Sequence, residues 1–191
     1  MRKIVFDIET RNEFSEVGSA DPAKLDLAVV GIYDSETDSY STYLQEELKE
    51  LWPILERAEM LIGYYSDHFD LPLLNKYYSG DLTKLRSFDL LKEIRKQYGR
   101  GMKLDQLAEG TLGKKKISHG LEAIKWWKQG EVEKIKQYCL DDVRITKELY
   151  DYAMQNGKLI FKEGSQLKEI ILDTKNWETS SENKLTFSLP F

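Results

Sequence analysis

The sequence contains few of the residues that characterise disulfide-stabilised, zinc-binding or membrane proteins. Cys139 is the only cysteine, so no disulfide can form within the chain, as is usual in a reducing compartment. The two histidines, His68 and His119, do not form a Cys/His zinc cluster. The chain does not open with a charged leader and an apolar stretch, and its apolar runs are too short to span a bilayer. We therefore expect a soluble, cytoplasmic protein with no membrane contact.

A surplus of positive charge is also missing. The net charge of −5 argues, by itself, against a nucleic-acid-binding protein. The charge is unevenly distributed, however. Residues 92–116 carry eight Lys/Arg and three acids, a charge of +5 (8 − 3), which leaves −10 (−5 − 5) for the remainder. Because that acidic excess could include a metal-binding cluster, the net charge does not decide the function.

The chain has enough apolar material for one folded domain. Of its 191 residues, 41% are hydrophobic and 12% are aromatic, so a full core can form and disorder is not expected.

Hydrophobic periodicity predicts strands in the first third of the chain and mainly helices after it. Strands are predicted at residues 2–9, 27–33, 39–44 and 59–64, with an antiparallel hairpin turn at 34–38. Helices are predicted at residues 45–58, 67–78, across most of 89–130, and at 131–155. The tail has strand-like patches at residues 169–172 and 184–189. This order predicts a layered α/β domain with a mixed sheet.

Two acidic residues, Asp7 and Glu9, interrupt the most hydrophobic of these strands. They are two positions apart, so both side chains point to the same face of the sheet. Neighbouring carboxylates in a buried strand repel each other and lose hydration, and a divalent cation between them would remove both problems. Such a pair also occurs where a strand simply ends in water, and this motif alone does not distinguish the two cases.

Another acidic residue in an apolar setting lies in the long predicted helix. Asp142 belongs to a core-facing stripe with alternating steps of three and four: Val132, Ile135, Cys139, Asp142, Thr146, Leu149 and Ala153. A buried carboxylate needs a partner, and Arg144 and Lys147 lie on other faces of the helix. Tyr138 precedes Asp142 by four residues, so its ring borders the same spot. The alternative is that Asp142 lies at the rim of the core.

Asp70 follows the predicted strand at 59–64 and precedes Pro72 by two residues. Because proline is tolerated in a helix only in the first turn, Asp70 is expected at a helix N-terminus. An acid at this position stabilises a helix without any further role, so Asp70 by itself indicates a cap as readily as a ligand.

Three segments together resemble the exonuclease motifs of the DnaQ-like proofreading superfamily, in the family's order. They are Phe6-Asp7-Ile8-Glu9-Thr10, then Gly63 followed after five residues by Phe69-Asp70-Leu71-Pro72, and Tyr138-Cys139-Leu140-Asp141-Asp142. The tyrosine four residues before the last aspartate resembles the tyrosine (DEDDy) subtype, because the histidine subtype would have histidine at Gln137. Residues 103–150 are also similar to small bacterial ribonuclease-H-like exonucleases, some of which are fused to helicases.

The resemblance implies a ribonuclease-H-like mixed β-sheet flanked by helices and a metal-dependent 3′→5′ exonuclease. Such an enzyme would release nucleoside 5′-monophosphates from the 3′ end of DNA or RNA, and we expect single strands. Two divalent ions, Mg²⁺ or Mn²⁺, are expected. By resemblance, Asp7 bridges both ions, Glu9 and Asp142 complete the ion on the nucleophile side, and Asp70 supports the leaving-group side. Tyr138 would orient and help activate the attacking water, although a tyrosine with a pKa of about 10 is a weak base.

The residues expected to contact nucleic acid are Thr10, Tyr65, Phe69, Lys114, Lys115 and Lys116. Members of the family often have asparagine where this chain has Tyr65, and this departure puts that substrate contact in doubt. The three lysines are predicted to lie in a loop of the basic segment 92–116, which could follow phosphates or simply be a solvated surface.

We predict that residues 1–157 form the ribonuclease-H-like exonuclease domain and that residues 158–191 are a strand-rich extension packed on it. Two other functions stay open: a non-catalytic nucleic-acid-binding module of the same fold, or an endonuclease with the same two-metal site. The sequence does not determine a preference for DNA or RNA, or any helicase or polymerase partner.

Overall fold

A mixed sheet of five strands forms the centre of the molecule. In the computed structural model, which describes residues 1–114 and 120–179, the strands are β1 (Lys3–Thr10), β2 (Leu27–Asp34), β3 (Ser39–Leu44), β4 (Met60–Gly63) and β5 (Ser87–Asp89). Their order in the sheet is β3–β2–β1–β4–β5. β1 pairs antiparallel with β2 and parallel with β4, β2 pairs antiparallel with β3, and β4 pairs parallel with β5. The carboxyl ends of β1, β4 and β5 therefore lie at one edge of the sheet.

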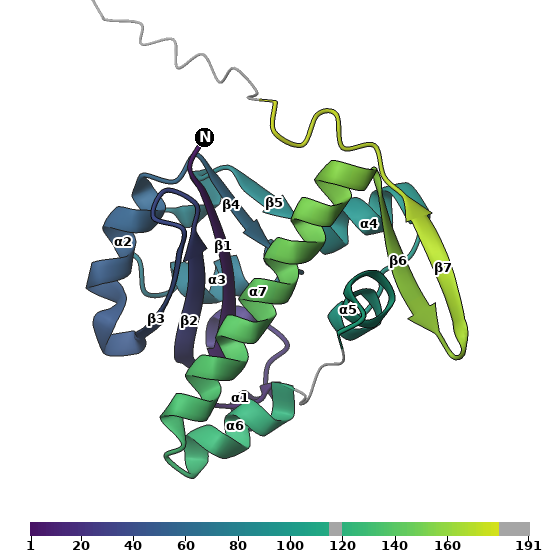
Figure 1. The fold of residues 1–191 in the computed structure, drawn as a ribbon. Helices are drawn as coiled ribbons and strands as arrows, with labels where there is room; N and C mark the ends of the chain where they lie inside the picture. The colour runs from purple at the N-terminus through teal and green to yellow at the C-terminus, as the bar shows by residue number, and fades with distance from the viewer. Residues whose placement is uncertain (115–119, 180–191) are drawn as a thin grey trace, which may run out of the picture.

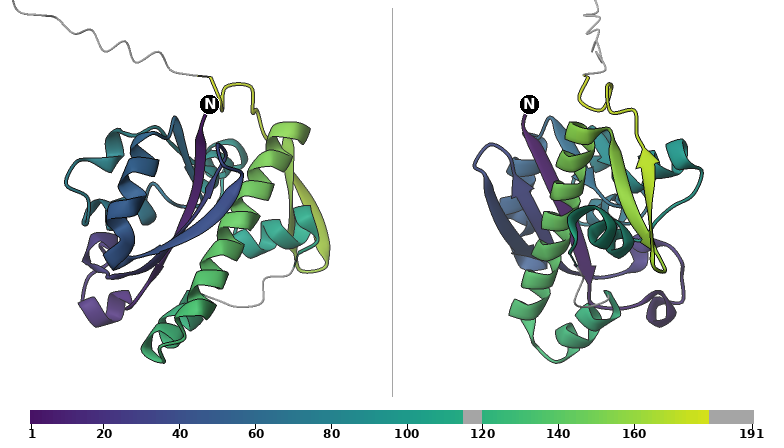
Figure 2. Two further views of the ribbon diagram at one scale, coloured as in Figure 1. Left: turned by 60° about the vertical axis from the view of Figure 1, so that its left-hand side comes forward. Right: turned by 45° about the vertical axis from the view of Figure 1, so that its right-hand side comes forward.

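Helices cover both faces of this sheet (Figures 1 and 2). The α-helices are α1 (Phe14–Val17), α2 (Leu48–Glu56), α3 (Asp70–Asn75), α4 (Leu90–Tyr98), α5 (Leu104–Leu112), α6 (Gly120–Lys128) and α7 (Val132–Asn156). Short 3₁₀ turns occur at Pro22–Lys24, Gln45–Glu47 and Leu82–Lys84. The longest helix, α7, crosses the sheet over β1 and β2, on the face opposite α2.

Alternation along β1 divides its side chains between the two faces. Ile4 and Ile8 belong to an apolar cluster that includes leucines of α2 and α3. Val5 belongs to a second cluster, formed with residues of α7. Asp7 and Glu9 follow Val5 at steps of two residues, so they share its face and point toward α7.

Two C-terminal strands, β6 (Lys158–Glu163) and β7 (Gln166–Ile171), form an antiparallel hairpin separate from the main sheet (Figure 1). The hairpin follows α7 directly, because Gly157 ends that helix with a φ of 63°, a left-handed conformation that glycine adopts at no steric cost. Leu159, Phe161 and Ile170 are fully buried, in the same apolar cluster as Val5 of the central sheet.

The architecture confirms the predicted mixed α/β sheet flanked by helices, including the hairpin between β2 and β3. The observed elements differ from the predicted ones in three places. The three-residue strand β5 was missed, α3 is shorter than the helix predicted at 67–78, and residues 158–163 form an unpredicted strand. The strand-like patch at 184–189 lies outside the described residues. Within the described part of the chain, no helix has both the length and the apolar character needed to cross a membrane.

Candidate active site

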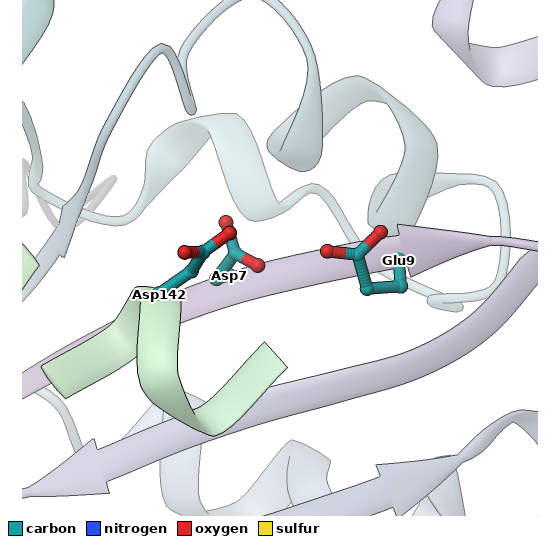
Figure 3. A group of neighbouring side chains, drawn as sticks. All are labelled: Asp7, Glu9 and Asp142. Carbon is teal, nitrogen blue, oxygen red and sulfur yellow. The ribbon is translucent and has the colours of Figure 1, made fainter. Parts of the chain in front are cut away.

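Three of the predicted carboxylates come together between β1 and α7. One carboxylate oxygen from each of Asp7, Glu9 and Asp142 lies within 4.8 Å of one from each of the others. Figure 3 shows Asp7 and Glu9 rising from β1 and Asp142 approaching from α7. Asp7 is half-buried, whereas Glu9 and Asp142 are only 8% and 5% exposed. Asp142 is therefore not at a solvated rim, and this alternative is wrong.

The close approach of α7 to the sheet depends on Gly31 of β2, the residue paired with Asp7. A Cβ atom at this position would lie 2.9 Å from Sγ of Cys139 and 3.2 Å from a methyl carbon of Val143, both on α7. Contacts this short require one of the two elements to move. The absence of a side chain at Gly31 therefore lets α7 bring Asp142 close to β1. Sequence reasoning missed this residue.

Cys139 lies directly beneath the acidic cluster. Its side chain is fully buried, and its thiol donates to the carbonyl oxygen of Asp7 over 3.3 Å and faces Oδ2 of Asp7 at 3.6 Å. Burial raises the pKa of the Cys139 thiol well above its usual value, and the charges of Asp7, Glu9 and Asp142 raise it further. The thiol thus stays protonated and serves as a hydrogen-bond donor. The charges of three carboxylates act on this one thiol, so negative charge is concentrated around it.

Asp70 is the first residue of α3, as the sequence predicted, and does not belong to the converging group of three carboxylates. Its carboxyl group is 4% exposed. Burial raises the pKa of Asp70 to about 8, and the nearby charge of Asp89 raises it as well, whereas the backbone N–H groups of Asp70 and Ile8 oppose this shift. Because Ile8 stands between Asp7 and Glu9, this interaction places Asp70 beside the strand that carries them.

Tyr138 lies one helical turn before Asp142 on α7 and is 7% exposed. Its ring packs edge-on against Trp126 of α6, with 5.9 Å between the ring centroids. The neighbouring Trp127 lies under the guanidinium of Arg11, which is 4.3 Å from the ring centroid. Helix α6 thus supports the tyrosine and also contacts the chain just beyond Glu9.

The residues predicted to contact nucleic acid fall in different places. Thr10 and Phe69 line an apolar cavity of about 500 Å³ that also includes Glu9. Tyr65 lines a second cavity of about 370 Å³. Lys114 is exposed and forms a salt bridge with Glu148 on α7, six residues beyond Asp142 and so about 9 Å farther along the helix axis. Lys115 and Lys116 lie outside the described residues.

The donor set fits a hard divalent cation. Carboxylate oxygens are the ligands that Mg²⁺ and Mn²⁺ prefer, and the cluster contains three of them within the span of one ion's coordination sphere. Burial and the charges of these three carboxylates raise the pKa of the Cys139 thiol, as expected where negative charge is concentrated. A bound cation would relieve this repulsion.

Comparison with known proteins agrees with this geometry. A family model described as the RNase_H superfamily matches residues 4–154, so the chain belongs to this superfamily. Among solved structures, the chain is similar to the family B DNA polymerase from the hyperthermophilic archaeon Pyrobaculum calidifontis, with a TM-score of 0.62 and 19% sequence identity. This similarity covers 81% of the chain but 24% of the polymerase, and it supports the fold alone. No curated protein matches the chain.

The ribonuclease-H-like fold is one on which hydrolytic nucleases are built. Nucleases with this fold generally use divalent metal ions, with which the acidic cluster of Asp7, Glu9 and Asp142 is compatible.

Proposed function

We propose that the protein is a metal-dependent 3′→5′ exonuclease of the DnaQ-like tyrosine subtype, acting on single-stranded nucleic acid. The proposal depends above all on one observation: carboxylate oxygens of Asp7, Glu9 and Asp142 lie within 4.8 Å of one another, and Glu9 also lines an apolar cavity. In the reaction, water attacks the last phosphodiester phosphorus and the bond from phosphorus to the 3′ oxygen breaks. A nucleoside 5′-monophosphate leaves, and the shortened strand keeps a 3′-hydroxyl group.

Four carboxylates are the proposed metal ligands. Asp7, Glu9 and Asp142 would hold the ions on the side of the attacking water, and Asp70 would support the side of the leaving group, directly or through water. Two bound Mg²⁺ or Mn²⁺ ions would neutralise the scissile phosphate and acidify the attacking water. Asp70 must lose its proton to take part, because only the carboxylate is a good ligand.

Tyr138 is the proposed positioning group for the attacking water. Its location one turn before Asp142 puts the two residues on the same side of α7, and packing against Trp126 restrains its ring. A phenol is a weak base near neutral pH, so its main contribution would be to orient the water by hydrogen bonding. Tyr138→Phe should therefore slow turnover while metal binding is retained.

The cavity beside Glu9 is the proposed binding site for the 3′-terminal nucleotide. Its lining is mainly apolar and includes Phe69 and Phe14, whose rings meet edge-to-face with 6.1 Å between centroids. Phe14 is 39% exposed, so an incoming base can reach it. Aromatic faces bind bases by stacking without strong sequence preference. Thr10 lies in the same wall. A cavity of about 500 Å³ suits one nucleotide at a strand end.

The deciding experiment is digestion of 5′-labelled single-stranded DNA and RNA with Mn²⁺, Mg²⁺ or EDTA. Asp142→Asn should lower the rate at least a hundredfold. The matched control is Asp141→Asn, because Asp141 is the adjacent residue, about half exposed and paired with Arg144, and this change should leave the rate nearly unaltered.

A metal-dependent ladder that shortens from the 3′ end would support the proposal and give the preferred sugar. Internal cuts would indicate an endonuclease with the same site. Binding of either strand without any cleavage would indicate a non-catalytic module.

A further inference from the structure

A second cavity lies at the same edge of the sheet as the proposed active site. It measures about 370 Å³ and is lined by Tyr65, Asp67, His68, Asp89, Lys92 and Arg95. It opens where β4 and β5 end, at Gly63 and Asp89, whereas the cavity beside Glu9 opens where the parallel strand β1 ends. Ligands of open α/β sheets bind at the carboxyl ends of their parallel strands. Both cavities therefore occupy a position suited to one extended ligand.

Two adjacent residues line the two cavities. Phe69 lines the cavity beside Glu9 and His68 lines the second cavity, and their Cα atoms are about 3.8 Å apart across one peptide bond. Asp70 follows directly, with its carboxyl group turned toward β1. A strand whose terminal nucleotide lies beside Phe69 would thus have its preceding nucleotide near His68 and Tyr65.

The loop that presents Tyr65 is held by a buried carboxylate. Tyr65 has a φ of 65°, a left-handed conformation that is unfavourable for a residue with a large side chain. Asp89 is 5% exposed, and its two oxygens accept the backbone N–H groups of Tyr65 at 2.9 Å and of Asp67 at 3.2 Å. These bonds fix the unusual backbone and orient the ring toward the second cavity. Strain retained in this way commonly marks a binding or catalytic position.

Aromatic and cationic groups meet in this cavity. The rings of Tyr65 and His68 lie 4.9 Å apart, and the guanidinium of Arg95 lies 5.2 Å from the centroid of the Tyr65 ring. Lys92 precedes Arg95 by three residues on α4, and both are exposed. Lys92 forms a salt bridge with Asp67 at 2.6 Å, whereas no carboxylate of residues 1–114 or 120–179 pairs with Arg95. Arg95 therefore offers a positive charge beside an aromatic face, in a cavity that Asp67 and Asp89 also line.

We propose that this cavity binds the nucleotide that precedes the cleaved bond, with its base against Tyr65 and its 5′ phosphate on Arg95. The proposal rests on the nuclease function proposed above. Stacking on aromatic rings and contact of arginine with phosphate are the two interactions by which single strands are bound without reading their sequence. The substrate would then be a single strand of at least two nucleotides with a phosphate on the 5′ side, and affinity would depend on that phosphate.

The test compares two substrates that differ in occupancy of this cavity. One is a single-stranded decamer, and the other is the p-nitrophenyl ester of thymidine 5′-monophosphate, which has no preceding nucleotide. Arg95→Ala should raise KM for the decamer about tenfold with little change in kcat, since one charged hydrogen bond contributes about that factor. The dependence of log KM on log salt should weaken by about 0.7, the value for one phosphate contact on a single strand.

The matched control is Lys96→Ala, which removes a cation one residue away on α4 that does not line this cavity. It should leave KM for the decamer near the wild-type value. Tyr65→Ala, which removes the ring, should raise KM for the decamer. Every variant is first checked for an unchanged melting temperature.

Equal KM values for Arg95→Ala and Lys96→Ala on the decamer would overturn the proposal. An equal loss for Arg95→Ala on the decamer and on the ester would also overturn it, because a preceding nucleotide would then be irrelevant. Failure of the nuclease function itself is distinguishable, since the wild-type protein would then turn over neither substrate.

Discussion

The buried carboxyl group of Asp70 holds its proton at neutral pH in the metal-free protein, because its pKa is raised from 3.8 to about 8. The folded state therefore binds this proton more tightly than the unfolded state does. As the pH rises from about 4 to about 8, the unfolded state loses this proton while the folded state keeps it, so the free energy of unfolding falls. Below pH 4 the group is protonated in both states and causes no such loss.

Asp70→Asn cannot ionise and should remove this pH dependence. In EDTA, the variant should gain stability relative to wild type as the pH is raised from 5 to 8, as measured by urea unfolding at each pH. Metal affinity of the wild type should rise over the same range, since the ligand must be deprotonated. Parallel pH profiles for the two proteins would mean that Asp70 is ionised in the folded state.

At the scale of elements, the active site depends on how closely α7 packs on β2. Gly31→Ala places a methyl group 2.9 Å from Sγ of Cys139 and should displace the helix. Overpacking of this kind costs about 1–3 kcal/mol of stability, and the displacement should lower nuclease activity further by moving Asp142 away from β1. The measurements are urea unfolding and the rate of oligonucleotide digestion.

A second substitution tests the cause of that loss. Cys139→Ala removes the sulfur atom that the new methyl group would meet. In the double variant, part of the stability and activity lost in Gly31→Ala should return, with a coupling free energy of about 1 kcal/mol. Strictly additive effects would show that the two positions act independently and that the glycine is not needed for the helix to approach.

The sequence predicted those elements whose apolar periodicity extends over enough residues to be recognised. β1, β2, β3 and α7 were predicted because apolar periodicity extends over six or more residues in each. β5 has three residues, too few for a period to be visible, and its position follows from pairing with β4 rather than from local preference. The short α3 is limited by the tight loop at Tyr65, which is held by the distant Asp89.

The sequence likewise predicted only part of the candidate site. Asp7, Glu9 and Asp142 stood out because they interrupt apolar patterns, and the structure brings them together. Gly31 and Asp89 gave no such signal. Gly31 matters through one contact with α7, and Asp89 through hydrogen bonds to Tyr65 and Asp67, all far away in sequence. Contacts of this kind are properties of the folded chain, not of any local pattern.

At the scale of the whole molecule, the C-terminal hairpin shares the core of the central sheet. Phe161 and Ile170 are fully buried in one cluster with Val5 and Ile62. We therefore propose that residues 158–179, the described part of the extension, belong to the same folding unit as residues 1–157, the predicted nuclease domain. The net charge of −5 also acts on the molecule as a whole, because it repels a polyanionic substrate at long range. Local cations and bound metal ions must therefore supply the attraction.

If the acidic cluster binds metal ions as proposed, the stability of the protein should depend on them. Mg²⁺ or Mn²⁺ that binds only the folded state stabilises it by about 2.7 kcal/mol at a concentration one hundred times its Kd, so both ions should raise the melting temperature of the wild type. With saturating metal the wild type should be more stable than Asp142→Asn, and in EDTA this order should reverse. Asp142→Asn removes one of three mutually repelling carboxylates and should be more stable than wild type by roughly 1 kcal/mol, without responding to metal.

Asp141→Asn, the adjacent exposed control, should resemble wild type in both buffers. Thermal unfolding of the three proteins with and without metal distinguishes two roles for Asp142. If Asp142→Asn is more stable than wild type in EDTA and does not respond to metal, the Asp142 carboxylate binds metal and destabilises the metal-free fold. Lower stability in EDTA would instead mean that its hydrogen bonds hold α7 on the sheet, and the cluster would then be structural.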